Sequence, residues 1–317
     1  MKRFLVLLLA SFVVMVGFAA PIVIKSSDVH PHGYPTVEAV KMMGRIIEVM
    51  TNGKYKIEVY VSGQLGDEKE TIEQTIMNAI QMTRVSVAPL QPFYDPIGVL
   101  TMPYLFRDED HFWKVLEGPI GEELLKGVEK IGLVGLCYYD AGARSFYTRR
   151  PVQKPEDLKG MKIRVQMNEV MVALMQALGA TGVPMAFAEV YTALQTGVVD
   201  GAENNPPSYY TTRHFEVAPY YCLDAHTRIP EILLISKAFW DKLTPEEKLI
   251  FKTAAIASAQ YEKYLWKQME QAALEAVQKG GAKIFQPDIT AFQKAAQPVY
   301  DKFPQYKDLI KRIQEVK

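Results

Sequence analysis

The sequence predicts an α/β protein folded as two lobes, joined by hinge strands and by one long helix that spans both lobes. Short apolar strand-like runs alternate with longer helical patterns, which is typical of α/β units with a largely parallel sheet. The chain has 317 residues, more than one hydrophobic core usually organises. No Pro- or Ser-rich linker separates the halves, so strands are expected to connect the lobes.

The N-terminus has the layout of a secretory signal peptide, predicted at residues 1–19. Lys2 and Arg3 precede an uncharged run, Phe4–Gly17, and small residues follow at the expected cleavage point after Ala19. An uncleaved membrane anchor stays open as the alternative. No later stretch approaches transmembrane length, so the mature chain is expected to be periplasmic without stable membrane insertion.

The first lobe is predicted to comprise residues 20–141 and about 230–269. Its elements are expected, in order, as a strand at Pro21–Lys25, a helix at Thr36–Met50, a strand at Lys56–Val61, a helix at Glu68–Gln81 and a strand at Val85–Ala88. The second lobe is predicted at 142–229 and about 270–317. Its elements are expected as a strand from Arg144, a strand at Met161–Val165 and helices at Glu169–Leu178 and Ala188–Thr196.

Two strands are expected to cross between the lobes. The apolar run Ile131–Asp140 leads through small residues into the second lobe, and Tyr220–Ile235 returns with a polar interruption at Asp224–Glu231. Small or polar residues at both crossings indicate a hinge. A helix is predicted to begin after Thr244, where Thr-Pro-Glu-Glu forms a capping box, and to end at Gly280.

Composition excludes several classes of partner. The 36 basic and 36 acidic residues balance, so neither nucleic acid nor a membrane surface is expected as a partner. The cysteines Cys137 and Cys222 lie in apolar runs and are predicted to be unpaired core residues, with a disulfide as the alternative.

Catalytic signatures are mostly missing from the sequence. It contains no G-x-S-x-G, H-E-x-x-H, P-loop or G-x-G-x-x-G motif, so neither an enzyme nor a cofactor is predicted. His30 and His32 could bind a metal, but no third ligand lies nearby, and a surface or cleft loop is the favoured interpretation.

Arg164 is a cation within a short apolar strand. A buried charge is costly unless it is paired or opens into a cleft where a ligand pairs with it. The planar fork of arginine suits a carboxylate. From these residues alone, ligand binding and a structural salt bridge are equally good explanations.

A second polar feature follows the turn at Asp200-Gly201. Glu203, Asn204 and Asn205 precede a helix that begins with two prolines. Loops at the carboxyl ends of strands bind ligands in open α/β sheets, although Asn-Pro also serves as an ordinary helix cap.

Four segments resemble the solute-binding subunits of tripartite ATP-independent periplasmic (TRAP) transporters, the DctP family, in order and spacing. They are Gly63–Asp67, Pro103–Phe106, Asp157–Arg164 and Glu189–Gly197 continuing to Asp200–Asn204. The resemblance implies a type II-like periplasmic binding protein fold that closes on an organic carboxylate and delivers it to membrane permease subunits driven by an ion gradient. A secreted enzyme acting on organic acids, or delivery to a membrane sensor, remains an alternative.

The resemblance also implies roles for individual residues. Arg164 matches the arginine that grips the ligand carboxylate, Arg144 and Asn204 match polar contacts, and Phe187 matches an aromatic residue that packs on the ligand's carbon skeleton. The polar candidates Asn205, Tyr209, Asp67 and His30 complete the expected ligand-binding set.

Two departures from family patterns narrow the ligand. Glu203-Asn204 replaces the Glu-Trp of metal-dependent keto-acid binders, and Val85–Leu90 lacks the glutamate of sialic-acid binders. The expected ligand is therefore a sugar acid or a C4-dicarboxylate, bound without a metal.

Overall fold

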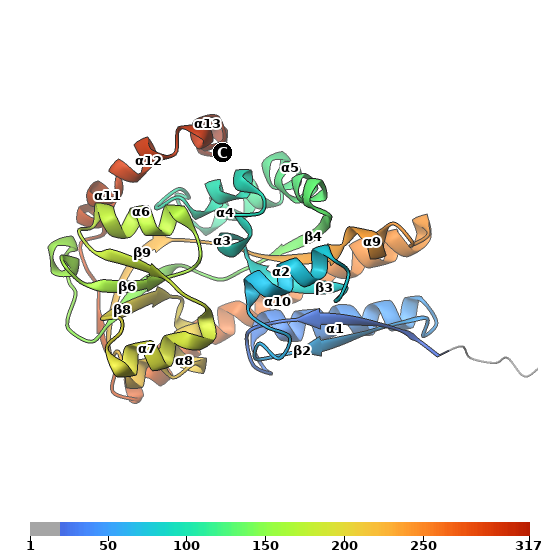
Figure 1. The fold of residues 1–317 in the computed structure, drawn as a ribbon, viewed down its shortest axis with the longest axis horizontal. Helices are drawn as coiled ribbons and strands as arrows, with labels where there is room; N and C mark the ends of the chain where they lie inside the picture. Colours follow the sequence, from blue (N-terminus) through green and yellow to red (C-terminus); the bar gives the residue numbers. More distant parts are fainter. Residues whose placement is uncertain (1–19) are drawn as a thin grey trace, which may run out of the picture.

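The computed structural model describes residues 20–317 as two β-sheets with flanking helices (Figure 1). The predicted signal peptide, residues 1–19, lies outside the described residues. Within residues 20–317, no helix is both long enough and apolar enough to cross a membrane.

The first sheet has five strands in the order β2-β1-β3-β10-β4. The strands span Ile22–Ser27 (β1), Tyr55–Tyr60 (β2), Met82–Ser86 (β3), Leu133–Tyr139 (β4) and Glu231–Ser236 (β10). β1 pairs in parallel with β2 and β3, whereas β10 is antiparallel to β3 and β4. The expected largely parallel sheet is therefore only partly correct, because β10 enters from the other sheet and runs against its neighbours.

Helices surround the first sheet. They span Pro35–Met50 (α1), Glu68–Ile76 (α2), Val87–Leu90 (α3), Glu109–Leu116 (α4), Pro119–Gly127 (α5) and Lys237–Trp240 (α9). The helix expected to reach Gln81 ends at Ile76 instead. Asn78 then adopts a left-handed φ of 58°, so the chain turns before β3 begins.

The second sheet has six strands in the order β11-β9-β5-β8-β6-β7. They span Arg144–Thr148 (β5), Lys162–Val165 (β6), Thr181–Pro184 (β7), Gly201–Asn204 (β8), Tyr220–Thr227 (β9) and Lys283–Phe285 (β11). The helices associated with it are Glu169–Ala177 (α6), Val190–Thr196 (α7) and Pro206–Thr211 (α8). β6 is parallel to β7 and β8, so the loops after these three strands lie at one edge.

Two strand connections join the sheets, at the predicted crossings. β4 leads into β5, and β9 leads into β10. Arg228 in the second connection pairs with Asp140 in the first, with Nη2 2.9 Å from Oδ2. Gly142 has a φ of +56°, and a Cβ there would lie 2.5 Å from a carboxylate oxygen of Glu270. The first crossing therefore needs a glycine.

The long helix α10 spans Pro245–Lys279, 35 residues, and begins at the predicted capping box of Thr244 and Glu247. At about 1.5 Å per residue it extends about 50 Å. It packs against α1 beside the first sheet and against α8 beside the second (Figure 1). The prediction of a helix spanning both halves is confirmed.

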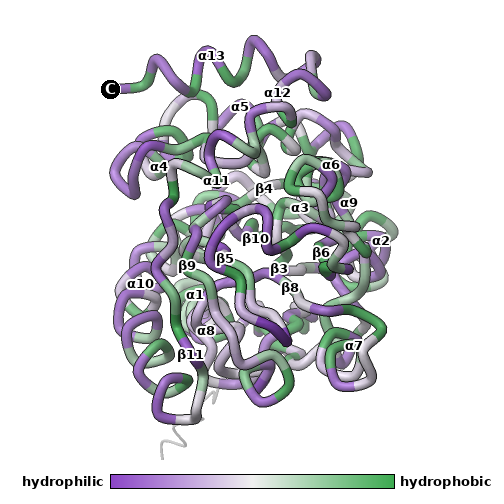
Figure 2. The backbone as a smooth tube through the Cα atoms, turned by 90° about the vertical axis from the view of Figure 1, so that its left-hand side faces the viewer, coloured by the Kyte–Doolittle hydropathy of each residue, from purple (hydrophilic) through white to green (hydrophobic). Residues whose placement is uncertain are grey.

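The C-terminal tail contacts both halves of the molecule. Helices α11 (Ile289–Ala296) and α12 (Pro298–Lys302) pack near α6, whereas α13 (Lys307–Glu315) packs against α5. Hydrophobic residues alternate with hydrophilic ones along α13 (Figure 2), and Ile310 and Ile313 are buried. The sequence predicts this tail wholly within the second lobe. The structure differs, because the apolar face of α13 covers part of the first half.

The core is continuous between the sheets. Its largest cluster joins Val85 and Ile232 of the first sheet with Phe146 and Ile163 of the second. Cys137 and Cys222 are free and buried, as predicted.

We predict that Thr244→Ala lowers the free energy of unfolding by about 1 kcal/mol, because it removes the hydroxyl that accepts from the Glu247 N–H at 3.2 Å. Chemical denaturation of the mature protein measures this. The exposed Thr192, on α7, is the control, and Thr192→Ala should change stability by less than about 0.5 kcal/mol. Equal losses in both variants would contradict the capping role.

Candidate functional site

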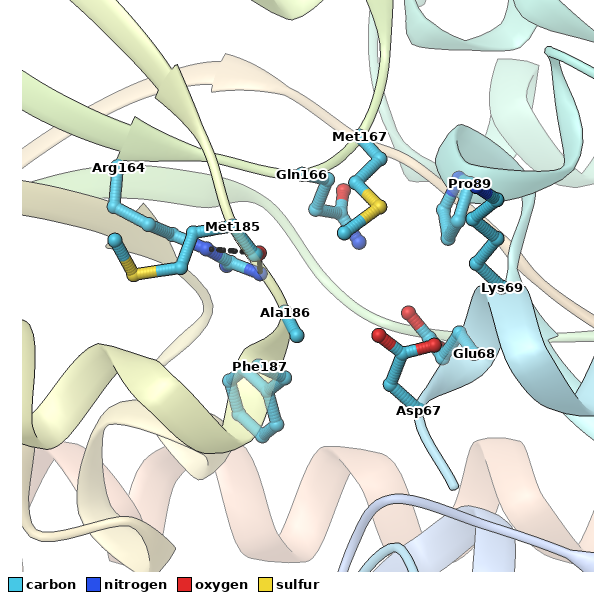
Figure 3. Close-up of a pocket in the computed structure, with 10 residues that line it drawn as sticks. All are labelled: Asp67, Glu68, Lys69, Pro89, Arg164, Gln166, Met167, Met185, Ala186 and Phe187. Carbon is cyan, nitrogen blue, oxygen red and sulfur yellow. Dashed lines mark hydrogen bonds between the residues drawn. The ribbon is translucent and has the colours of Figure 1, made fainter. Parts of the chain in front are cut away.

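Two adjoining cavities lie where loops from the two sheets meet. The first has about 270 Å³ of empty space, with the solvent at its mouth included, and is lined by residues that include Asp67, Arg164 and Phe187 (Figure 3). The second has about 300 Å³ on the same measure and is lined by residues that include His30 and Asn204. The cavities share Glu68, Arg164, Gln166 and Phe187. They therefore form one candidate binding cleft.

Arg164 projects from β6 into both cavities and is 3% exposed. Its Nε and Nη2 donate to the carbonyl oxygen of Met185 at 3.0 and 2.7 Å. Its Nη1 is buried without a hydrogen-bond partner among residues 20–317. Burial lowers the pKa of Arg164, and this effect outweighs the increase that the nearby charge of Glu203 would cause. This guanidinium makes no ion pair with a described residue. The structural salt bridge that the sequence left open as an explanation is therefore not formed among residues 20–317.

Two other buried polar atoms around the same cleft also lack partners in the described part of the chain. They are Oε1 of Gln166 and Nδ1 of His30. Buried polar groups normally have hydrogen-bond partners. Nη1 of Arg164 and these two atoms have none among the described residues, and all three lie at one cleft, which indicates a polar ligand. Burial, with repulsion from Arg84 and Arg144, lowers the pKa of His30 well below its ordinary value. The His30 ring is therefore neutral.

Arg144 differs from Arg164 because a carboxylate neutralises it. Its Nε and Nη2 donate to the two carboxylate oxygens of Glu203 at 2.5 and 2.9 Å, and Nη1 donates to Oδ1 of Asn204 at 2.9 Å. Burial alone would raise the pKa of Glu203, but Arg144 and His226 lower it to about 2. Arg144 faces the second cavity as part of this neutral pair.

An acidic cluster forms the opposite side of the cleft. Arg84 of β3 contacts three carboxylates, those of Asp28, Glu68 and Glu231. Glu68 also accepts from the Ser86 N–H at 2.8 Å. Burial, followed by repulsion from Glu231, raises the pKa of Glu68 to about 7 even though Arg84 opposes the shift. Three acids around one guanidinium give this wall an excess of negative charge or a bound proton.

Most of the predicted ligand-binding residues lie at the cleft. Phe187 packs beside Arg164, with the guanidinium carbon 5.8 Å from the ring centroid. Asn204 and Asn205 line the second cavity, and Asp67 lines the first while capping α2. The structure thus brings together seven of the eight predicted residues, which are Arg164, Arg144, Asn204, Phe187, Asn205, Asp67 and His30.

Tyr209 does not lie at the cleft, which corrects its predicted place there. It is fully buried among aromatic residues, and its hydroxyl donates to the carbonyl of Ala218 at 2.7 Å. The first turn of α8 directs this side chain into the core of the second half. His32 lines neither cavity, and its Nδ1 lies 2.9 Å from Nζ of Lys41.

The sequence interpretation missed Glu68, Gln166, Ser208 and Glu231, which all line the cleft. Gln166 had a signal, because residues two apart on an extended strand share a face and Arg164 was already a candidate. Glu68 directly follows Asp67, the last residue of one of the recognised segments. Glu231 gave no local signal, since it reaches the cleft only through the pairing of β10 with β3.

Comparison with known proteins gives consistent matches. Residues 26–306 match the model of the family described as bacterial extracellular solute-binding protein, family 7 (DctP). The C4-dicarboxylate-binding periplasmic protein DctP of Rhodobacter capsulatus is 35% identical over 90% of this chain and 87% of that protein. A TRAP periplasmic solute binding protein of Xanthobacter autotrophicus Py2 with bound β-D-galacturonate is 45% identical, with a TM-score of 0.90 over 93% of this chain and 100% of that one.

A third relative, from Citrobacter koseri, has been solved in two states. Its structure with bound D-glucuronate is 43% identical, covers 93% of this chain and 100% of that one, and gives a TM-score of 0.90. Its ligand-free open structure covers 92% of this chain and 98% of that one and gives 0.83. The arrangement of the two sheets here is therefore closer to the ligand-bound state.

We predict that Glu68→Gln reduces the pH dependence of stability between about pH 4.5 and 7. The folded state raises the pKa of this carboxyl to about 7. Between about pH 4.5 and 7 the folded wild-type protein therefore binds more protons than the unfolded wild-type protein. This group therefore destabilises the fold progressively as pH rises. Glutamine mimics the protonated form, so the variant should gain stability relative to wild type at pH 8.

Thermal unfolding of both proteins at pH 5 and pH 8 measures the difference. We expect the gain at pH 8 to exceed that at pH 5 by about 1–3 kcal/mol. A variant that is equally destabilised at both values would show that Glu68 is a charged structural group.

Proposed function

This chain belongs to the DctP family of extracellular solute-binding proteins of TRAP transporters. From that premise we propose that it captures a sugar acid with one carboxylate, of the size of a hexuronate, and delivers it to a membrane permease. The unpartnered Nη1 of Arg164 carries the proposal. A ligand carboxylate there would accept charge-assisted hydrogen bonds in a site that excludes water. The uronates bound by two relatives support the same ligand class.

The charges around the cleft favour one carboxylate over two. Arg144 is already neutralised by Glu203, and the opposite wall carries Glu68 and Glu231. Like charges about 4 Å apart repel by about 4 kcal/mol at an effective dielectric constant of about 20. A second ligand carboxylate would meet that repulsion or require proton uptake by Glu68. A C4-dicarboxylate is therefore the weaker candidate.

The uncharged remainder of a sugar acid matches the other cleft groups. Gln166 and His30 present open polar atoms, and Asn205 and Ser208 lie beside them. Such groups can bind sugar hydroxyls, while the face of Phe187 can pack against the apolar face of a pyranose ring. Under this proposal Asn204 and Asp67 add polar contacts at the two ends of the cleft.

Closure and location complete the proposal. The first lobe would comprise residues 20–141 and about 230–269, and the second lobe residues 142–229 and about 270–317. The contacts of α13 with α5 are the exception, because they join this tail to the first lobe. They would move about the two strand crossings. The family's periplasmic location supports export by the predicted signal peptide. A role in capture and delivery requires no catalytic group, and the proposed residues are assigned to binding alone.

We predict that D-glucuronate or D-galacturonate stabilises the mature protein against heat, whereas D-glucose does not and succinate does so weakly. D-glucose is the matched control because it has the hydroxyls without the carboxylate. A ligand at 100 times its Kd adds about 2.7 kcal/mol of stability. Thermal-shift screening followed by calorimetry measures this. A response to succinate alone would reverse the proposed ligand class.

We predict stability effects of different size for two arginine substitutions. Arg164→Met should abolish uronate binding, a loss of about 100-fold or more, yet change the ligand-free stability by no more than about 1 kcal/mol because no ion pair is broken. Arg144→Met should destabilise the protein by about 3–5 kcal/mol, because it leaves Glu203 buried and unpaired.

Calorimetric titration and chemical denaturation of both variants separate the two roles. Arg164→Lys is the conservative control and should recover part of the affinity, since it restores charge without the planar fork. If Arg164→Met binds the uronate within a few-fold of wild type, the carboxylate role of Arg164 is wrong.

A further inference from the structure

Tyr34 connects the two halves of the molecule next to the cleft. It precedes α1, beside the first sheet, and its hydroxyl lies 2.9 Å from Oγ of Ser208 and 3.5 Å from Oδ1 of Asn205. Both partners belong to the start of α8, which follows β8 of the second sheet. Tyr34 is 2% exposed, so water does not compete for this contact in the arrangement seen here.

The ring of Tyr34 is held in place by packing that does not involve its hydroxyl. It stacks on His30, with centroids 3.6 Å apart and planes 5° from parallel, and it meets Trp266 of α10 edge-on at 6.0 Å. A side chain that is already fixed by packing loses little rotamer entropy when it forms a hydrogen bond. The contact with Ser208 therefore keeps most of its free energy.

The same stack continues to the cleft. His30 meets the ring of Phe187 edge-on, with centroids 5.3 Å apart, and Phe187 lines both cavities. Tyr34 itself lines neither cavity. Its hydroxyl therefore influences ligand binding without touching the ligand, through the relative position of the two halves and through its partners Ser208 and Asn205.

We propose that Tyr34 is an interlobe latch, a positioning residue whose hydrogen bond to Ser208 forms as the cleft closes and stabilises the closed state without touching the ligand. A contact made in the closed state alone shifts the equilibrium by its own free energy. Apparent ligand affinity then rises with the fraction of closed molecules. The sheet arrangement, which is closer to that of a ligand-bound relative than to that of its open form, supports this assignment.

The test compares two Tyr→Phe variants of the mature protein. Tyr34→Phe keeps the ring and its stacking but removes the hydroxyl. Tyr139→Phe is the matched control, because the Tyr139 hydroxyl makes an equivalent buried contact with Oγ of Ser258, at 2.8 Å, between β4 and α10 and away from the cleft. Calorimetry and stopped-flow binding use D-glucuronate and D-galacturonate as probes, so the ligand arm rests on the proposed function.

We expect Tyr34→Phe to raise Kd about three- to ten-fold, through faster dissociation at an unchanged association rate. Tyr139→Phe should lower the unfolding temperature but leave Kd unchanged. A role of Tyr34 in fold stability alone would give the second pattern. The latch is overturned if Tyr34→Phe binds the uronate as tightly as wild type, or if both variants weaken binding equally.

If wild type binds neither uronate, the proposed ligand class fails, and the latch is judged on the ligand-free protein instead. Spin labels at the exposed Lys56 of β2 and Gln195 of α7 report the distance between the halves. Tyr34→Phe should reduce the population at short distance. An unchanged distance distribution overturns the latch.

Discussion

Three buried arginines lie around the cleft, and they differ in the number of carboxylates within ion-pair distance. Arg84 has three and Arg144 has one, whereas Arg164 has none among the described residues. The positive charges of the first two are therefore compensated by carboxylates of the framework, which are in excess around Arg84. Arg164 has no such partner, so the cleft has an uncompensated positive charge on one side and the acidic wall of Glu68 and Glu231 on the other.

The backbone fixes Arg164 as firmly as a binding group requires. β6 is paired on both sides, with β7 and β8. The chain that leaves β7 places the Met185 carbonyl so that Nε and Nη2 of Arg164 donate to it. The remaining Nη1 has its direction set before any ligand arrives, which reduces the entropy lost on binding. The second half contributes Arg164, Gln166, Phe187, Asn205 and Ser208 to the cleft, whereas the first half contributes His30 and the acidic wall.

Local signals predicted much of this architecture. The capping box at Thr244 marked the start of α10, and the charged residue in an apolar strand marked Arg164. What failed depended on contacts between distant segments. An amphipathic pattern indicates a helix at α13 but does not say which half it covers, and the sequence around Tyr209 does not show that its hydroxyl turns toward Ala218. Glu231 joined the cleft only through the antiparallel return of β10.

The position of β10 in the first sheet has a consequence for biosynthesis. This strand lies between β3 and β4, yet it is synthesised almost 100 residues after β4. A chain that emerges from its N-terminus cannot complete the sheet, or bury the core that both halves share, until residues 231–236 arrive. The incomplete sheet would leave β3 and β4 without their common partner until then. Sheet order thus makes the completion of the first sheet a late event of synthesis.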